Sequence, residues 1–118
     1  MKLLPPSLRK RKRYIAFEII SARPVEPEKV REALSTSLLK LYGEFGSPEF
    51  RLIEFRDGKG MLMCFHDELE KVKIALTLIK KINNQDVIPV ILGVAGTIKS
   101  CRRKYLEVLR NANSTDGI

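Results

Sequence analysis

The clearest chemical signal in this sequence is two short runs of basic residues. The first run, near the start of the chain, comprises Arg9, Lys10, Arg11, Lys12 and Arg13. The second run, near the end, comprises Lys99, Arg102, Arg103 and Lys104. Guanidinium and ammonium groups bind phosphates and carboxylates through charge-assisted hydrogen bonds. The two runs therefore predict an anionic partner, most often a nucleic acid and second a membrane surface.

The positive charge is concentrated at the two ends of the chain, whose formal net charge is +8 over 118 residues. Residues 1–23 carry seven basic residues against one acidic residue, and residues 96–118 carry five against two. The intervening residues 24–95 are nearly balanced, with ten basic and eleven acidic residues. A one-signed excess of this kind favours a binding surface over solubility alone.

Side chains for catalysis or metal binding are sparse. The single histidine, His66, and two cysteines, Cys64 and Cys101, cannot complete a four-ligand zinc site, and we assign His66 a structural role. The sequence contains no phosphate-loop or dinucleotide-binding motif and no supported Ser-His-Asp or Cys-His pattern. The glycines in "GVAGT", residues 93–97, favour close packing at a strand end. We therefore expect no catalytic residue, no metal site and no cofactor bound by the protein.

Length and composition predict one globular domain. The 118 residues are 44% hydrophobic, which is enough for a buried core. The longest apolar run, near 87–96, is too short to cross a bilayer, and no signal peptide is recognisable. Two cysteines without an export signal predict free thiols and a cytoplasmic location.

Hydrophobic periodicity predicts a strand and then a helix. Residues 13–22 alternate as a strand that places Ile15, Phe17 and Ile19 on one face. Pro24 and Pro27 end this strand, and a helix follows to about Tyr42, where glycines end it. Its apolar stripe comprises Val30, Leu34, Leu38, Leu41 and Phe45.

A hairpin follows, because Asp57 and Gly58 separate the predicted strands 50–56 and 60–66. We predict that Asp67 then caps a second helix, which runs as far as "NNQD". The apolar stripe of that helix comprises Leu69, Val72, Leu76 and Ile79.

A strand over 87–96 and a last helix complete the chain. Pro89 favours an edge position for the strand, and Thr97 is the candidate cap of a helix that reaches Ala112. The apolar stripe of this helix comprises Ile98, Cys101, Tyr105, Val108, Leu109 and Ala112. The chain thus divides into a basic arm (1–12), an α/β domain (13–112) and a frayed tail (113–118).

The element order β-α-β-β-α-β is that of a ferredoxin-like, RNA-recognition-motif-like α/β sandwich, here with an extra C-terminal helix. In this fold four antiparallel strands lie in the order 4-1-3-2. The start of the first strand, at Arg13, should therefore lie beside the end of the fourth, at Gly96. The topology brings the two basic runs to one end of the sheet. Cations in the first turns of a helix oppose its dipole, which favours a role in phosphate binding.

The usual ligand surface of such sheets is not recognisable here. RNA-recognition motifs stack bases on strand aromatics, but "KGMLMCFH", residues 59–66, has Met61 and Met63 at those positions. An acylphosphatase would need a glycine-rich, arginine-bearing loop where this chain has "SARPVEPE". The sheet face away from the two main helices is too apolar to face water, so we expect the last helix or a partner protein to cover it.

Two motifs together resemble the archaeal ribonuclease P protein component 2 (Pop-five) family. They are "LPPSLRKRKRYIAFEI", residues 3–18, and "GTIKSCRRKYLE", residues 96–107, and the resemblance covers essentially the whole chain. It implies a non-catalytic protein subunit of the ribonucleoprotein endonuclease that removes the 5′ leader from precursor tRNA. It also implies an active site with magnesium on the RNA subunit and a larger TIM-barrel-like protein partner. The resemblance allows a homodimer within a heterotetramer.

On this interpretation the two basic runs neutralise phosphates of folded RNA and stabilise its active form. Two alternatives remain open from the sequence. A free-standing RNA-binding module would bind RNA without affecting leader cleavage, and a protein-interaction module with charge only for solubility would show no salt-dependent RNA binding. A small-molecule enzyme is disfavoured because no catalytic constellation is present.

Overall fold

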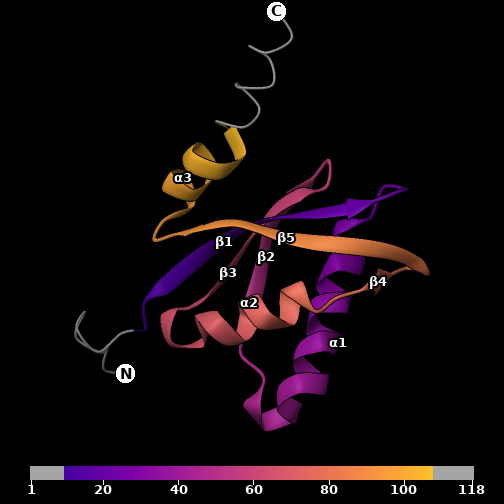
Figure 1. The fold of residues 1–118 in the computed structure, drawn as a ribbon. Helices are drawn as coiled ribbons and strands as arrows, with labels where there is room; N and C mark the ends of the chain where they lie inside the picture. The colour runs from indigo at the N-terminus through magenta and orange to yellow at the C-terminus, as the bar shows by residue number, and fades with distance from the viewer. Residues whose placement is uncertain (1–9, 108–118) are drawn as a thin grey trace, which may run out of the picture.

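The computed structural model describes residues 10–107, which form one antiparallel sheet with helices on both faces (Figure 1). In chain order the elements are β1 (Lys12–Ser21), α1 (Pro27–Gly46), β2 (Phe50–Arg56), β3 (Lys59–Phe65), a 3₁₀ turn (His66–Glu68), α2 (Leu69–Thr77), β4 (Lys81–Ile82), β5 (Gln85–Ala95), α3 (Ile98–Cys101) and a π-helical segment (Arg102–Glu107). We call α3 and the π-helical segment together the α3 cap. Among these residues, no helix combines the length and the apolar character needed to cross a membrane.

The sheet has the strand order β2-β3-β1-β5-β4, and every neighbouring pair is antiparallel. The mixed α/β class is confirmed and the four longer strands have the expected order, but the prediction of four strands is wrong. The fifth strand, β4, pairs with the start of β5 across Asn83 and Asn84, whose φ angles are 53° and 65°. Asparagine tolerates these left-handed angles, so "NN" forms a hairpin turn where the sequence predicted only a helix end.

Pro89 lies on a free edge of the sheet, as predicted. β4 pairs with Gln85 and Asp86, and Val87 N still donates to Lys80 O at 2.9 Å, so the β4 side of β5 is open only from Ile88 onward. Pro89 lies opposite Ile19, whose N–H donates to Gly58 O at 2.7 Å, on the side away from β5. In an antiparallel ladder the backbone nitrogen of Pro89 therefore faces the open edge of the sheet. Because proline has no N–H, no hydrogen bond of the sheet is lost there, and pairing of this edge with another strand is hindered.

The main core lies between the sheet and the helices α1 and α2. Ile15, Phe17 and Ile19 of β1 are at most 3% exposed, and the Phe17 ring stacks on Phe55 with centroids 6.0 Å apart. Burial of each such side chain stabilises the fold by about 1.5–3 kcal/mol. The predicted inward face of β1 is therefore confirmed, and the helices cover it from the side seen at the bottom of Figure 1.

The end of α1 differs from the predicted stripe. Val30, Leu34 and Leu38 are buried, but Leu41 is 42% exposed and Phe45 is fully exposed. Continued spacing of four residues brings Tyr42 rather than Leu41 to the core. Gly43, with φ 76°, then breaks the helix where the sequence predicted its end, which turns Phe45 away from the sheet.

The start and end of α2 also differ from prediction. Asp67 lies within the 3₁₀ turn and makes no capping hydrogen bond, so its assignment as N-cap is wrong. The helix ends at Thr77 because the chain must turn back to form the β4–β5 hairpin. Val72, Leu76 and Ile79 are buried, and Leu69 packs against them, so the predicted stripe is confirmed.

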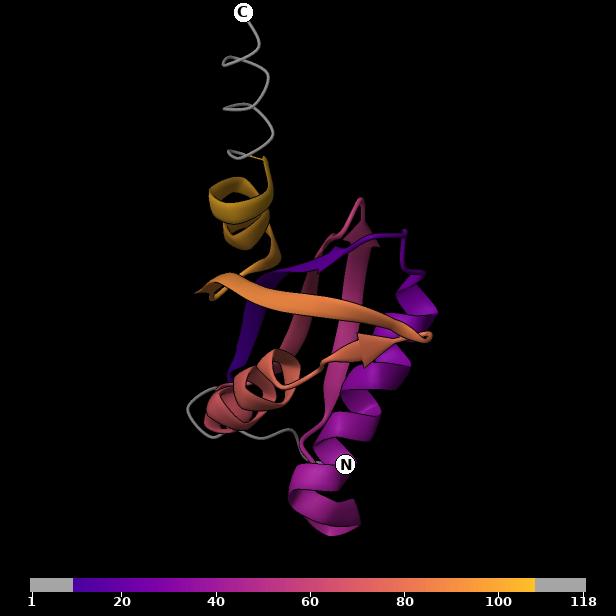
Figure 2. The same ribbon diagram turned by 45° about the vertical axis from the view of Figure 1, so that its right-hand side comes forward.

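The α3 cap covers part of the opposite sheet face, which we call the outer face (Figure 2). Cys101 and Leu106 of the cap pack with Ala16, Met61 and Ala95 of the strands, so the last helix covers this apolar face as expected. Thr97 caps α3 by accepting a hydrogen bond from Ser100 N at 3.1 Å. The predicted helix positions 108–112 and the tail 113–118 lie outside the described residues, as does most of the predicted arm.

Gly93 allows the cap to approach the sheet closely. A Cβ atom at Gly93 would lie 2.2 Å from the Tyr105 ring, whose hydroxyl donates to Val94 O at 3.4 Å. The expectation that a glycine in "GVAGT" serves close packing is therefore confirmed for Gly93. Gly96, at the same strand end, would meet nothing within 4 Å.

We predict that Gly93→Ala lowers the free energy of unfolding by about 1–3 kcal/mol, the usual cost of overpacking. Urea unfolding followed by circular dichroism measures the change. Gly96→Ala is the matched control and should change stability by less than Gly93→Ala does. Equal effects of the two substitutions would contradict the close contact with Tyr105.

Candidate nucleic-acid interface

The two basic runs meet at one end of the sheet. Tyr14 of β1 pairs directly with Ala95 of β5, so the chain enters the sheet at Lys12 close to where it leaves at Thr97. The Cys101 thiol lies 3.6 Å from Tyr14 O and ties the α3 cap to the same place. The predicted convergence is therefore present, except that Arg9 lies outside the described residues.

Strand alternation divides the first run between the two faces. Lys12 has the parity of Tyr14 and Ala16, which lie on the outer face with the α3 cap. Arg13 has the parity of Ile15 and shares the face of α1 and α2. The sheet thus brings Lys12, but not Arg13, to the side of the cap.

The start of the first run is held against β3 and the 3₁₀ turn. Lys10 Nζ lies 5.4 Å from the centre of the Phe65 ring, a cation–π contact. Arg11 O accepts a hydrogen bond from His66 N at 2.7 Å. These contacts fix the backbone and leave the Arg11 side chain exposed.

The four cations of the second run divide into two groups. Lys99, Arg103 and Lys104 are exposed and form no ion pair with any residue in 10–107. Arg102 is half-buried, and its Nε and Nη2 donate to Glu54 Oε1 at 3.2 and 2.5 Å. Arg102 therefore fastens the α3 cap to β2 while neutralising Glu54.

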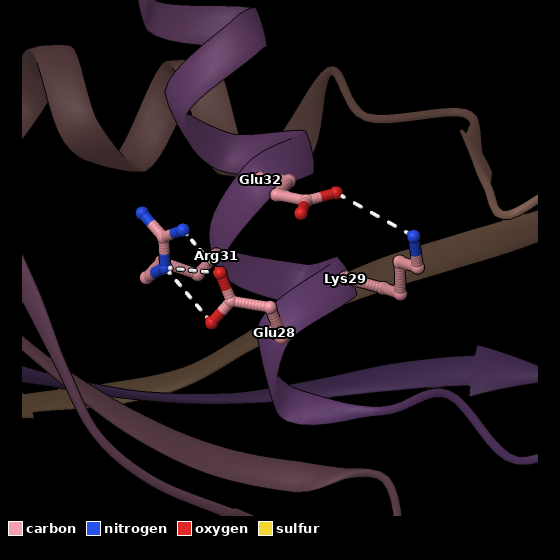
Figure 3. A network of polar contacts seen from close by, with 4 residues as sticks. All are labelled: Glu28, Lys29, Arg31 and Glu32. Carbon is pink, nitrogen blue, oxygen red and sulfur yellow. Dashed lines mark hydrogen bonds and ion pairs between the residues drawn. The ribbon is translucent and has the colours of Figure 1, made fainter.

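Charges on the helices, by contrast, compensate one another. Arg31 is hydrogen-bonded to Glu28, and Lys29 Nζ lies 3.7 Å from Glu32, as Figure 3 shows. The hydrogen bond from Arg31 lowers the pKa of Glu28. The 3₁₀ turn and α2 carry two further pairs of the same spacing, Lys71–Glu68 and Lys73–Glu70. The uncompensated positive charge is accordingly concentrated away from α1 and α2.

Sequence reasoning missed three further cations on the outer face. The strand register places Arg51 beside Met63, and Arg56 beside Lys59 and Glu18, all on the side of Tyr14 and Ala16. The net charge of residues 24–95 is near zero because acidic residues on the helices offset these three cations in the sum, although they lie elsewhere in the structure. The alternation of side chains along the two predicted hairpin strands could have assigned the cations to one face.

Comparison with known proteins identifies the family of this chain. The family model described as Rpp14/Pop5 matches residues 13–106. The chain belongs to the Rpp14/Pop5 family. A relative named ribonuclease P protein component 2, from Archaeoglobus fulgidus, is 50% identical over 109 residues, covering 92% of this chain and all of the relative. The protein of the same name from Pyrococcus furiosus is 38% identical over 110 residues, covering 90% and 92%.

A solved structure shares the fold of this Rpp14/Pop5 chain. A chain in the cryo-EM structure of yeast ribonuclease MRP superposes with a TM-score of 0.65, covering 92% of this chain and 95% of that one. Sequence identity is 15%, so this likeness concerns the fold. The Rpp14/Pop5 match, over residues 13–106, includes nearly all of β1 and of the α3 cap, where the basic runs converge.

Both cysteines of this Rpp14/Pop5 chain are free and buried, on opposite faces of the sheet. Burial raises the pKa of Cys64 and of Cys101 to about 11, and the carboxylates of Glu68 and Glu54 respectively contribute. Neither thiol therefore supplies a thiolate near neutral pH. Within residues 10–107, no group of three or more His, Cys, Asp or Glu side chains could hold a metal ion.

We predict that both thiols react with a disulfide reagent at pH 8 only after unfolding. The unfolded thiols titrate near their ordinary pKa, whereas the folded thiols stay protonated to about pH 11. Their contribution to stability is thus complete below about pH 9 and is lost as pH rises toward 11. Between pH 8 and pH 10, the free energy of unfolding measured in urea should fall less for C64A/C101A than for the parent chain. Fast thiol labelling of the folded chain at pH 8 would contradict this.

Proposed function

We propose that this chain is a protein subunit of ribonuclease P that binds and stabilises the catalytic RNA for removal of the 5′ leader from precursor tRNA. The near full-length similarity to proteins named ribonuclease P protein component 2 supports the assignment. The observation that carries the RNA-binding role is the uncompensated charge where β1 and the α3 cap meet. Its described members are Lys10, Arg11, Lys12, Lys99, Arg103 and Lys104, which we call the terminal basic cluster.

The proposed mechanism is electrostatic and structural. Cations of the terminal basic cluster replace the counterions of closely spaced phosphates, and the release of those counterions drives binding. Arginines add bidentate hydrogen bonds to phosphate oxygens. Arg102, whose predicted RNA contact stays a prediction, also positions the cap by donating to Glu54. Catalysis, with its magnesium ions, belongs to the RNA in this proposal, and the protein contributes no reacting group.

A larger protein subunit is the second proposed partner, and exposed apolar side chains on the helices support its docking there. Leu39 is 49% exposed on α1, and Ile74 and Leu78 are 47% and 50% exposed on α2 or at its end. Ile74 and Leu78 lie four residues apart, with Leu78 N bonded to Ile74 O, so they share one face of α2. Adjoining exposed apolar side chains are typical of a protein interface. Formation of a homodimer also stays a prediction, which sedimentation equilibrium would check. A free-standing RNA-binding module is the alternative.

The test of the main proposal is a reconstituted cleavage assay with ribonuclease P RNA, the larger protein subunit and precursor tRNA at limiting magnesium. We expect omission of this chain to slow leader removal about tenfold or more, equivalent to about 1.4 kcal/mol of lost stabilisation. With K99A/R103A/K104A in place of the parent chain, the assay should need a higher magnesium concentration to reach the same rate of leader removal. R23A/K80A/K81A, which removes the same charges at the other end of the sheet, is the control. Cleavage that is indifferent to this chain, together with retained RNA binding, would favour the free-standing module.

For the protein partner, we predict that L39S/I74S/L78S weakens binding of the larger subunit at least tenfold. Each half-exposed side chain has about 1 kcal/mol of further burial to contribute. Isothermal titration calorimetry measures the affinity. I20S/I88S/V90S is the matched control, because it removes exposed apolar side chains from the outer face. A larger loss for the control would move the proposed docking surface to the outer face.

A further inference from the structure

The outer face of the sheet is arranged in rows that cross the strands. One row contains Arg51, Met63 and Tyr14, and the next contains Glu54, Met61 and Ala16. A third row contains Arg56, Lys59 and Glu18. Because directly paired residues share one side of a sheet, every member of a row lies on the outer face. Arginines therefore stand on β2 on both sides of Glu54.

The register depends on an irregularity in β2. Leu52 pairs with Leu62 and Glu54 pairs with Met61, so Ile53 is an extra residue on the bulged strand. Without the bulge, Arg51 and Arg56 would lie on opposite faces, since they are five positions apart and successive residues of a strand alternate between faces. With it, both lie on the outer face, while Leu52 and Phe55 pack into the main core.

The α3 cap removes the carboxylate charge at the centre of this surface. Arg102 neutralises Glu54, which is the acidic residue between the two arginines. Two other carboxylates remain nearby: Glu18, opposite Lys59, and Asp57, in the turn beside Arg56. Neither forms an ion pair within 4.0 Å with any residue in the described chain. Arg51, Arg56 and Lys59 also form no such pair, and both arginines are exposed.

From this arrangement we infer that Arg51, Arg56 and Lys59 form a second phosphate-binding surface for RNA, on the outer face of β2 and β3. This inference rests on the proposed function, because it extends the contact with the same RNA. We call these three residues the strand basic surface. It continues from the terminal basic cluster through Lys12, which lies at the same end of the outer face as Arg51.

The chemistry favours the RNA backbone as ligand. Five residues of strand span about 16 Å, so Arg51 and Arg56 would contact separate phosphates rather than clamp one small anion. No Phe or Trp lies among the three cations, and the neighbouring Tyr14 is packed against the α3 cap. A surface of spaced cations without stacking rings contacts phosphates and does not read bases.

The strand basic surface predicts a specific change in salt dependence. For R51A/R56A/K59A we expect the slope of log affinity against log salt to fall by about two to three, close to one for each lost phosphate contact. Fluorescence anisotropy with ribonuclease P RNA, over a range of salt concentrations, measures the slope. R23A/R31A/K40A, with the same loss of charge on the helix side, is the matched control and should lower the slope by less than about one.

Two further measurements distinguish a loss of charge from a loss of folded structure, and an RNA ligand from an acidic protein ligand. R51K/R56K retains the cations and should retain the slope, and circular dichroism should show that every variant is folded. Polyglutamate should displace the RNA only weakly, because its charges lie about 3.3 Å apart along an extended chain, against about 1.7 Å along a nucleic-acid duplex. Displacement by polyglutamate at the same charge concentration would overturn the inference in favour of an acidic protein ligand.

The remaining outcomes are distinguishable from failure of the proposed function. If the parent chain binds the RNA with a steep salt slope that R51A/R56A/K59A leaves unchanged, only the inference is overturned. It is equally overturned if the control lowers the slope as much, since net charge alone would then explain the change. If the parent chain shows no salt-dependent RNA binding, the proposed function and the inference both fail.

Discussion

The pairing of β1 with strands on both sides is the constraint on which the rest of the structure depends. β1 pairs with β3 from Lys12 to Glu18 and with β5 from Tyr14 to Ser21. This central position buries Ile15 and Phe17 completely and provides the inner face against which α1 and α2 pack. The same pairing joins Tyr14 to Ala95, which are 81 positions apart in sequence, so hydrophobic burial also determines where the charges at the two ends meet.

The two faces of the sheet are covered by different kinds of packing. The inner face is covered by two helices with regular apolar stripes, which need only the right period and volume. The outer face is covered by the short α3 cap, and three local features allow it to fit. Gly93 leaves room for the Tyr105 ring, Cys101 of the cap packs against the sheet, and Arg102 of the cap donates to Glu54 of β2. The cap therefore connects the fold of the outer face with the position of Lys99, Arg103 and Lys104.

Ion pairing, rather than amino-acid composition, determines which surfaces of this protein carry a net positive charge. The cations of α1 and α2 other than Lys40 form ion pairs with acidic residues three positions away. Such paired charges contribute little to the electrostatic field at a distance. Cations of β1, β2 and the α3 cap have few acidic neighbours. The positive electrostatic potential of the protein is therefore strongest at the outer face and at one end of the sheet. Arg102, a basic residue of the predicted binding run, also forms a contact within the fold. Its ion pair with Glu54 removes a negative charge from the surface that we propose faces RNA.

Local periodicity and turn chemistry determined much of the fold from the sequence alone. Alternation placed Ile15, Phe17 and Ile19 on one face, Asp57 and Gly58 indicated the hairpin, and the element order indicated that the basic runs converge. Predictions that depended on spatial neighbours were decided only by the tertiary structure. The β4 strand exists because two residues find a partner in β5, and Phe45 is exposed because Gly43 turns the helix end. The register of β2 depends on a bulge, and the role of Arg102 depends on Glu54, 48 residues away. A one-residue shift in register moves every side chain to the other face, and sequence patterns do not specify such shifts. For this reason the sequence determined where the charge is concentrated, whereas the structure decided which cations share a surface.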